Sequence, residues 1–144
     1  MANYSRAFKS QTEAFNRRVR VWACKSCGAY CKQSKPTICT TCGGKAFHYF
    51  ASQAEFKRWA ELKLQERAGL LDNLRCSVKY PLEVNGQLIC SYIADFVYDV
   101  DGRRVVEDVK PASTGDEGQH RIFKLKAKLM QAIHNIDIKI VKRG

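Results

Sequence analysis

Hydrophobic residues in the second half of the chain alternate with polar ones in three consecutive runs, as in half-buried β-strands. The runs span residues 74–84, 87–100 and 103–110 and are separated by Asn85-Gly86 and Asp101-Gly102. Asn-Gly and Asp-Gly favour two-residue type I′ hairpin turns, because both central residues of such a turn need a positive φ. The pattern therefore predicts a three-stranded antiparallel meander.

Apolar residues at helical spacing flank this meander on both sides. The stripe before it comprises Phe56, Trp59, Ala60, Leu64 and Ala68, and Lys57, Arg58 and Arg67 are expected to lie away from it. The stripe after it comprises Ile122, Leu125, Leu129, Ala132 and Ile133, opposite a basic face. Ser52 is placed to cap the first helix and Gly69 to end it. Alternation of Ile136, Ile138 and Ile140 with polar residues predicts a last strand, so the order is helix, three strands, helix, strand.

Four cysteines near the N-terminus fall into two Cys-x-x-Cys-Gly segments, at residues 24–28 and 39–43. Glycine after the second cysteine allows the positive φ that turns backbone amides toward the thiolates. This spacing predicts a zinc ribbon in which structural Zn²⁺ is held by Cys24, Cys27, Cys39 and Cys42, and the metal would supply the folding free energy of so small a module. The alternative is four reduced or disulfide-paired cysteines. Cys31, Cys76 and Cys90 are expected to be small buried or half-exposed residues.

Composition indicates a soluble globular protein with one core and a small appendage, since 45% of the 144 residues are hydrophobic and 27% are charged. The 25 basic and 14 acidic residues give a net charge of +11, which favours a polyanion, foremost nucleic acid, as partner. No apolar run approaches the length of a membrane span, and no signal-peptide core precedes the cysteines. We therefore expect no membrane association and a cytoplasmic location, in the host cytoplasm if the chain is phage-encoded.

The Asp101-Gly102 turn also predicts a metal site. If Val100 pairs with Arg103, then Asp95 faces Asp108 on the neighbouring strand. Facing residues have Cβ atoms about 5 Å apart, so two like charges there are destabilising unless something compensates them. A divalent cation would do so. Strand alternation sends Glu107 to the opposite face of the sheet.

Three short segments resemble the motif of the PD-(D/E)xK nuclease superfamily, whose core has the order αβββαβ. The segments are Ser52-x-x-Glu55, Ile93-Ala94-Asp95 and Asp108-Val109-Lys110, and Ala94 stands where the motif name has proline. The likeness covers roughly residues 50–142 and is closest to small phage and prophage-encoded members. It implies an α/β (α+β) restriction-endonuclease-like core. The domains would be a basic N-terminal arm (1–20), a zinc ribbon (21–48) and the nuclease core (50–144).

The resemblance implies an endodeoxyribonuclease that hydrolyses phosphodiester bonds with Mg²⁺ or Mn²⁺. Asp95, Asp108 and the Val109 backbone carbonyl would be ligands of the cation. Lys110 would orient or deprotonate the attacking water, and Glu55 would bind a second metal ion or a metal-bound water. Local sequence alone equally fits Glu55 as the second member of a capping box that begins at Ser52.

Branched DNA, such as Holliday junctions or other intermediates of recombination, repair or replication, is the expected substrate. Cutting both strands of a junction would require a homodimer. Arg121, Lys124 and Lys128 on the second helix are expected to follow a phosphate backbone, against the alternative of an ordinary solvated face. Four lysines around the ribbon also favour nucleic acid: Lys25, Lys32, Lys35 and Lys45. The ribbon would grip DNA or contact the second subunit of a dimer.

Two alternative functions stay open. The first is a non-catalytic zinc-ribbon protein that binds nucleic acid or regulates, with an inactive nuclease-like core; the full set of Asp95, Asp108 and Lys110 argues against it. The second is a ribosome-associated RNA-binding protein, which leaves the facing acids unexplained. RNA binding without cleavage would favour it.

Overall fold

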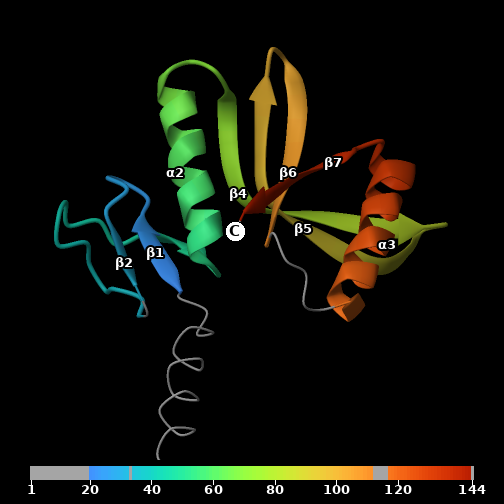
Figure 1. The fold of residues 1–144 in the computed structure, drawn as a ribbon, viewed down its shortest axis with the longest axis horizontal. Helices are drawn as coiled ribbons and strands as arrows, with labels where there is room; N and C mark the ends of the chain where they lie inside the picture. The colour runs from blue at the N-terminus through green and yellow to red at the C-terminus, as the bar shows by residue number, and fades with distance from the viewer. Residues whose placement is uncertain (1–19, 33, 112–116, 144) are drawn as a thin grey trace, which may run out of the picture. The chain divides into compact units, whose positions relative to one another are not determined.

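The computed structural model describes residues 20–32, 34–111 and 117–143, in two compact units that divide between Gln53 and Ala54 (Figure 1). The predicted basic arm therefore lies outside the described residues, except for Arg20. Neither described helix is both long enough and apolar enough to cross a lipid bilayer.

The first unit contains a three-stranded antiparallel sheet in the order β2-β1-β3. Its strands are β1 (Val21–Cys24), β2 (Tyr30–Lys32) and β3 (Phe47–Phe50). β3 pairs with β1 along its whole length, so the sheet extends to Phe50, slightly past the predicted end of the ribbon at residue 48.

The second unit is a mixed α+β fold built around a four-stranded sheet in the order β4-β5-β6-β7. Its elements are α2 (Gln53–Arg67), β4 (Asp72–Val84), β5 (Gln87–Val100), β6 (Arg103–Pro111), α3 (Glu117–His134) and β7 (Ile138–Arg143). The first three strands form an antiparallel meander, and β7 adds to β6 in parallel. The predicted order of helix, three strands, helix, strand is confirmed, although the last strand begins at Ile138 and continues to Arg143.

Both hairpin turns have the predicted backbone. Asn85 and Gly86 have φ of 51° and 76°, and Asp101 and Gly102 have φ of 50° and 75°. These are the two consecutive positive values that a type I′ turn requires. The turns fix the register of the strands that they join.

The core of the second unit lies between the meander and α3. Its buried residues are Leu82, Tyr92, Ala94, Val97, Val106 and Met130. Phe123, Leu129 and Ile133 pack against them from α3. The predicted α3 stripe is thus partly wrong, because Ile122 and Leu125 are 51% and 60% exposed. Apolar residues occur on more than one face of α3, so spacing alone could not identify the face that packs.

The inward face of α2 also differs from the prediction. Trp59 and Leu62 are buried, whereas Leu64, placed in the predicted stripe, is 64% exposed. Arg58, predicted to point outward, has a side chain only 13% exposed because it pairs with Glu107, which is fully buried. A hydrophobic pattern cannot anticipate this orientation, since the cause is a buried carboxylate far away in the sequence.

Candidate functional site

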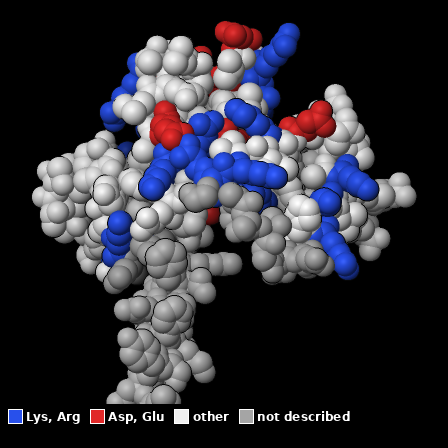
Figure 2. Space-filling model, viewed as in Figure 1, with Lys and Arg blue, Asp and Glu red and all other residues white. Residues whose placement is uncertain are grey.

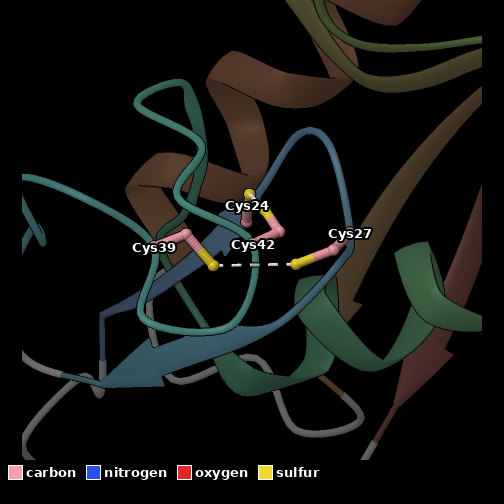
Figure 3. Close-up of side chains that lie close together, drawn as sticks. All are labelled: Cys24, Cys27, Cys39 and Cys42. Atoms are coloured by element: carbon pink, nitrogen blue, oxygen red, sulfur yellow. Dashed lines mark hydrogen bonds between the residues drawn. The ribbon is translucent and has the colours of Figure 1, made fainter.

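Four cysteine sulfur atoms in the first unit form a compact cluster (Figure 3). The Sγ atoms of Cys24, Cys27, Cys39 and Cys42 all lie within 4.8 Å of one another. Cys24 Sγ is 3.6 Å from Cys42 Sγ, and Cys27 Sγ is 3.6 Å from Cys39 Sγ. A tetrahedral site with zinc–sulfur bonds of about 2.3 Å needs sulfurs about 3.8 Å apart. The cluster therefore has the dimensions of a four-thiolate metal site and can hold a metal ion.

Glycines shape the two turns that carry these cysteines. Gly28 and Gly43 have φ of 78° and 75°, as predicted for the position after each Cys-x-x-Cys pair. Gly44 is needed for a different reason, because a Cβ there would lie 3.0 Å from Cys24 Sγ and 3.3 Å from Cys42 Sγ. Any side chain at this position would push against the cluster.

The electrostatics of the cluster favour a bound cation. The hydrogen bond from the Cys27 backbone amide is the main cause that lowers the pKa of the Cys24 thiol to about 6. The Cys42 amide likewise lowers the pKa of Cys39. A hydrogen bond from the Gly44 amide favours the Cys42 thiolate, but the adjacent Cys27 and Cys24 sulfurs outweigh it and raise the Cys42 pKa to about 12. Amides thus support individual thiolates, and only a cation could let all four ionise together.

A second candidate site lies in the second unit, where β5 meets β6. The paired positions run from Val100 with Arg103 to Phe96 with Glu107. Asp95 and Asp108 are the next residues beyond this ladder. The predicted register is confirmed over this ladder.

Hydrogen bonds and an ion pair fix the two acids. The Val109 amide donates to Asp95 Oδ2 at 2.8 Å, and the Tyr92 hydroxyl donates to Asp108 Oδ2 at 2.8 Å. Lys110 Nζ lies 2.7 Å from Asp108 Oδ1 and 4.3 Å from the centre of the Phe123 ring. Asp108 Oδ1 is itself buried and accepts no hydrogen bond, so this ammonium is its partner only as an ion pair.

Charge is unbalanced at this site. The pKa of Asp95 is raised to about 7, first by burial and then by the negative charge of Asp108. Glu55 in the first turn of α2 raises it further, whereas the Val109 amide and Lys110 lower it. Asp95 is thus subject to the charges of the three other predicted side chains, Glu55, Asp108 and Lys110.

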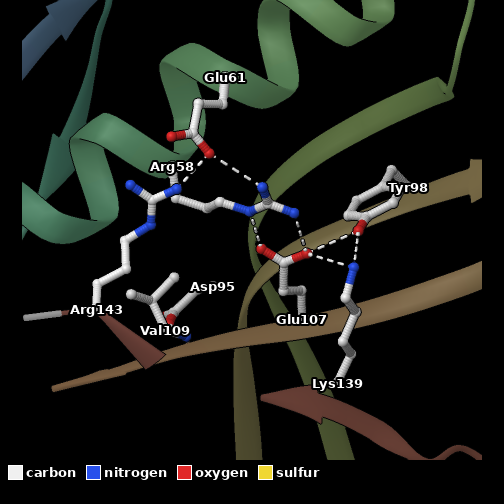
Figure 4. Close-up of polar contacts among 8 residues, drawn as sticks. All are labelled: Arg58, Glu61, Asp95, Tyr98, Glu107, Val109, Lys139 and Arg143. Carbon is white, nitrogen blue, oxygen red and sulfur yellow. Dashed lines mark hydrogen bonds and ion pairs between the residues drawn. The ribbon is translucent and has the colours of Figure 1, made fainter. Parts of the chain in front are cut away.

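Glu107, the neighbour of Asp108, belongs to a separate network (Figure 4). Arg58 donates to its two oxygens through Nε at 2.5 Å and a terminal nitrogen at 2.9 Å, and the Tyr98 hydroxyl donates at 2.7 Å. Burial favours the neutral acid, but these hydrogen bonds outweigh it and the pKa of Glu107 is lowered. Its carboxylate is fully engaged, which supports the choice of Asp108 rather than Glu107 for the candidate metal site.

Arg58 extends this network along α2. Its other terminal nitrogen donates to Glu61 Oε2 at 3.1 Å, and Arg143 at the end of β7 also pairs with Glu61. Lys139 Nζ lies 3.7 Å from Glu107 Oε2. The sequence did not predict this network, because strand alternation indicates only the face of the sheet on which Glu107 lies and not the side chains that bind it. It also missed Tyr92, whose hydroxyl is the hydrogen-bond partner of Asp108.

Basic side chains lie on exposed surfaces of the same unit. The predicted Arg121, Lys124 and Lys128 are all exposed on α3. Figure 2 shows a further gathering of basic side chains over β6 and β7. β7 contributes Lys139 and Lys142, both exposed. These β7 lysines were not predicted, although their alternation with apolar residues was a usable signal.

One comparison with known proteins gives a match. A family model described as "Protein of unknown function (DUF1064)" matches residues 44–142, which is more than half of the chain. The matched range contains the whole carboxylate site and begins after the last of the four clustered cysteines. No curated protein and no solved structure matches the chain.

Proposed function

We propose that this chain, which belongs to the DUF1064 family, is an endodeoxyribonuclease that uses Mg²⁺ or Mn²⁺ to hydrolyse phosphodiester bonds. The observation that carries the proposal is that the carboxylates of Asp95 and Asp108, on adjacent strands, act electrostatically on each other beside the Lys110 ammonium. The αβββαβ element order supports it, because that is the order the resemblance to PD-(D/E)xK nucleases implies.

The donor atoms fit a hard divalent cation. Such ions take oxygen ligands and need only one or two protein carboxylates. Tyr92 engages Asp108 Oδ2, whereas the buried Oδ1 accepts no hydrogen bond and has the Lys110 ammonium as its ion-pair partner, so Oδ1 would be the oxygen that binds the metal ion. Burial is the main cause of the raised pKa of Asp95, and the negative charge of Asp108 adds to it; a cation would compensate that charge.

Asp95 and Asp108 would hold the cation, with the Val109 carbonyl as a further ligand. The Val109 amide donates to Asp95, and the amide and carbonyl of one strand residue point to the same side of the strand, so the carbonyl is suitably directed. When bound, the cation would lower the pKa of a coordinated water and polarise a phosphoryl oxygen.

The other side chains would act on water and phosphate. The Lys110 ammonium would orient the attacking water and help to neutralise the charge that develops on the phosphoryl group. Its contact with the Phe123 ring limits the positions open to it. Glu55 would bind a second cation or orient a water from the α2 side, since its charge already acts on Asp95.

Duplex or branched DNA is the proposed partner. The chain carries a net charge of +11, and exposed basic residues occur on both α3 and β7. Each phosphate neutralised by such a residue releases counterions, so binding would be strongly salt-dependent. A homodimer would place two sites on the two strands of a junction.

We also propose that the four-cysteine cluster binds structural Zn²⁺. Four thiolates leave no open coordination position, so this metal would stabilise the first unit and take no part in hydrolysis. The sulfur separations of 3.6 Å support zinc.

A panel of linear, flap and four-way DNA substrates, each with and without Mg²⁺ or Mn²⁺, tests the nuclease proposal. We expect metal-dependent nicking or cutting of branched DNA by the wild-type protein. Asp108→Asn and Lys110→Met should each reduce the rate by at least about 100-fold. Asp101→Asn is the matched control, because Asp101 is an exposed acid in the turn of the same hairpin. A folded, zinc-loaded wild-type protein that cuts none of the substrates would contradict the proposal and favour a binding protein without catalysis.

A further inference from the structure

We infer that one face of the first unit binds the bases of an unpaired DNA strand. This face, here called the stacking face, consists of Trp22, Tyr49 and Lys35. The inference concerns binding and does not depend on the proposed cleavage.

The stacking face presents two aromatic rings side by side. Trp22 on β1 is paired with Tyr49 on β3, so both side chains project from the same side of the sheet. Their ring centres are 4.7 Å apart with an interplanar angle of 46°. The Lys35 ammonium lies 5.8 Å from the centre of the Trp22 ring. Rings and a cation together match the two parts of a nucleotide, its planar base and its phosphate.

The opposite side of the same sheet already supplies the buried core of this unit. Val21 and Ala23, which alternate with Trp22, are fully buried, and Phe50, next to Tyr49, is 3% exposed. Tyr49 by contrast is 46% exposed. Packing of the sheet therefore does not account for the large aromatic ring of Tyr49.

Charge selects the kind of ligand. Between residues 20 and 53 every charged side chain is basic, and all of them are exposed: Arg20, Lys25, Lys32, Lys35 and Lys45. Four thiolates on one divalent cation contribute −2, so the five basic residues leave a net charge of +3. Aromatic rings on an acid-free, cationic module match an anionic partner with exposed planar groups.

Single-stranded DNA has that chemistry, and duplex DNA does not. Single-strand-binding proteins combine basic surfaces with aromatic side chains on which bases stack, at about 1–3 kcal/mol per base. In a duplex the faces of the bases are covered by their neighbours, so only the base edges, sugars and phosphates remain for contact. The stacking face should therefore prefer unpaired DNA, such as the single-stranded part of a flap or fork.

Tryptophan fluorescence of the full-length, zinc-loaded protein can report on this face alone. The chain has two tryptophans, so Trp59→Phe leaves Trp22 as the only one. This variant is titrated with a short oligothymidine and with a hairpin duplex of the same nucleotide count, without added Mg²⁺ or Mn²⁺ so that no cleavage occurs. We expect oligothymidine to quench Trp22 and the duplex to leave its emission unchanged. Equal quenching by both, or quenching by neither, would overturn the inference.

Substitutions in the same background locate the contact. Tyr49→Ala should weaken oligothymidine binding, measured by fluorescence anisotropy, by roughly 5- to 150-fold, and Tyr49→Phe should retain it. Tyr30→Ala is the matched control, because Tyr30 is 55% exposed on the neighbouring strand and projects from the other side of the sheet. Zinc content and melting temperature establish that each variant is folded. A Tyr49→Ala protein that is folded and binds as well as Tyr30→Ala would show that the stacking face is not used.

Discussion

Removal of Arg58 should destabilise the second unit strongly, because it leaves a buried charge without its main partner. Glu107 is fully buried and receives two hydrogen bonds from the Arg58 guanidinium. Breaking a buried ion pair typically costs about 3–5 kcal/mol. Tyr98 and Lys139 would still contact the carboxylate, so we expect Arg58→Met to lose about 3 kcal/mol of unfolding free energy, near the lower end of that range. For a unit of this size the loss corresponds to a melting temperature lower by roughly 12–24 °C.

Urea denaturation followed by circular dichroism measures this loss, and a double-mutant cycle assigns it. Glu107→Gln in the Arg58→Met background should recover at least half of the loss, since the uncompensated charge is removed. Lys63→Met is the matched control on the same helix. Lys63 pairs with Glu66 at 2.8 Å but is 38% exposed, and such pairs contribute less than about 0.5 kcal/mol. If Arg58→Met loses no more unfolding free energy than Lys63→Met, or if the double variant recovers none of it, the Arg58–Glu107 pair does not stabilise the second unit.

The pH dependence should change sign between the two proteins. In the wild type the pKa of Glu107 is lowered, so its contribution to stability is complete above the ordinary glutamate pKa and is lost as pH falls through the lowered value. In Arg58→Met, burial without the guanidinium should raise that pKa. The variant would then gain stability, relative to the wild type, as pH falls. Thermal denaturation of both proteins at pH 4 and pH 7 would detect this difference.

Three further outcomes are expected. Mass spectrometry under native conditions should find about one zinc ion per chain. Cys39→Ser should lose this ion together with the structure of the first unit. A folded wild-type protein without metal would contradict the zinc ribbon. Because the pKa of Asp95 is raised to about 7, the metal-free second unit should lose stability as pH rises from about 4 to 7. For the same reason Mg²⁺ should raise the melting temperature more at pH 8 than at pH 5.5. An equal Mg²⁺ effect at both pH values would argue against ligation by Asp95. Replacing Lys124 and Lys128 with glutamine should weaken duplex binding evenly across sequences and reduce the slope of log affinity against log salt by roughly 2, whereas an unchanged slope would make α3 an ordinary solvated face.

Features that depend on local chemistry could be predicted from the sequence. The Asp101-Gly102 turn determined the pairing of β5 with β6 as far as Phe96 and Glu107, because turn geometry fixes register. The spacing of the cysteines similarly predicted a cluster whose sulfurs do lie together. In both cases a few adjacent residues contain all the information.

Features that depend on distant partners could not be predicted. Arg58 looked like a surface residue, and only the folded chain brings it to Glu107, 49 positions away. The hydroxyl of Tyr92 that engages Asp108 was hidden for the same reason, since a tyrosine in a strand is expected to be a core residue. The packing face of α3 was misjudged because both Ile122 and Phe123 fit helical spacing, and contact with Tyr92 selects the second.

Binding of Mn²⁺, followed by electron paramagnetic resonance, can show whether the carboxylates of Asp95 and Asp108 share a divalent cation. We predict that the wild-type protein takes up Mn²⁺ at a site that Asp95→Asn and Asp108→Asn each abolish and that Asp101→Asn preserves. Unaltered Mn²⁺ uptake in both site variants, or none in the folded wild type, would contradict this prediction.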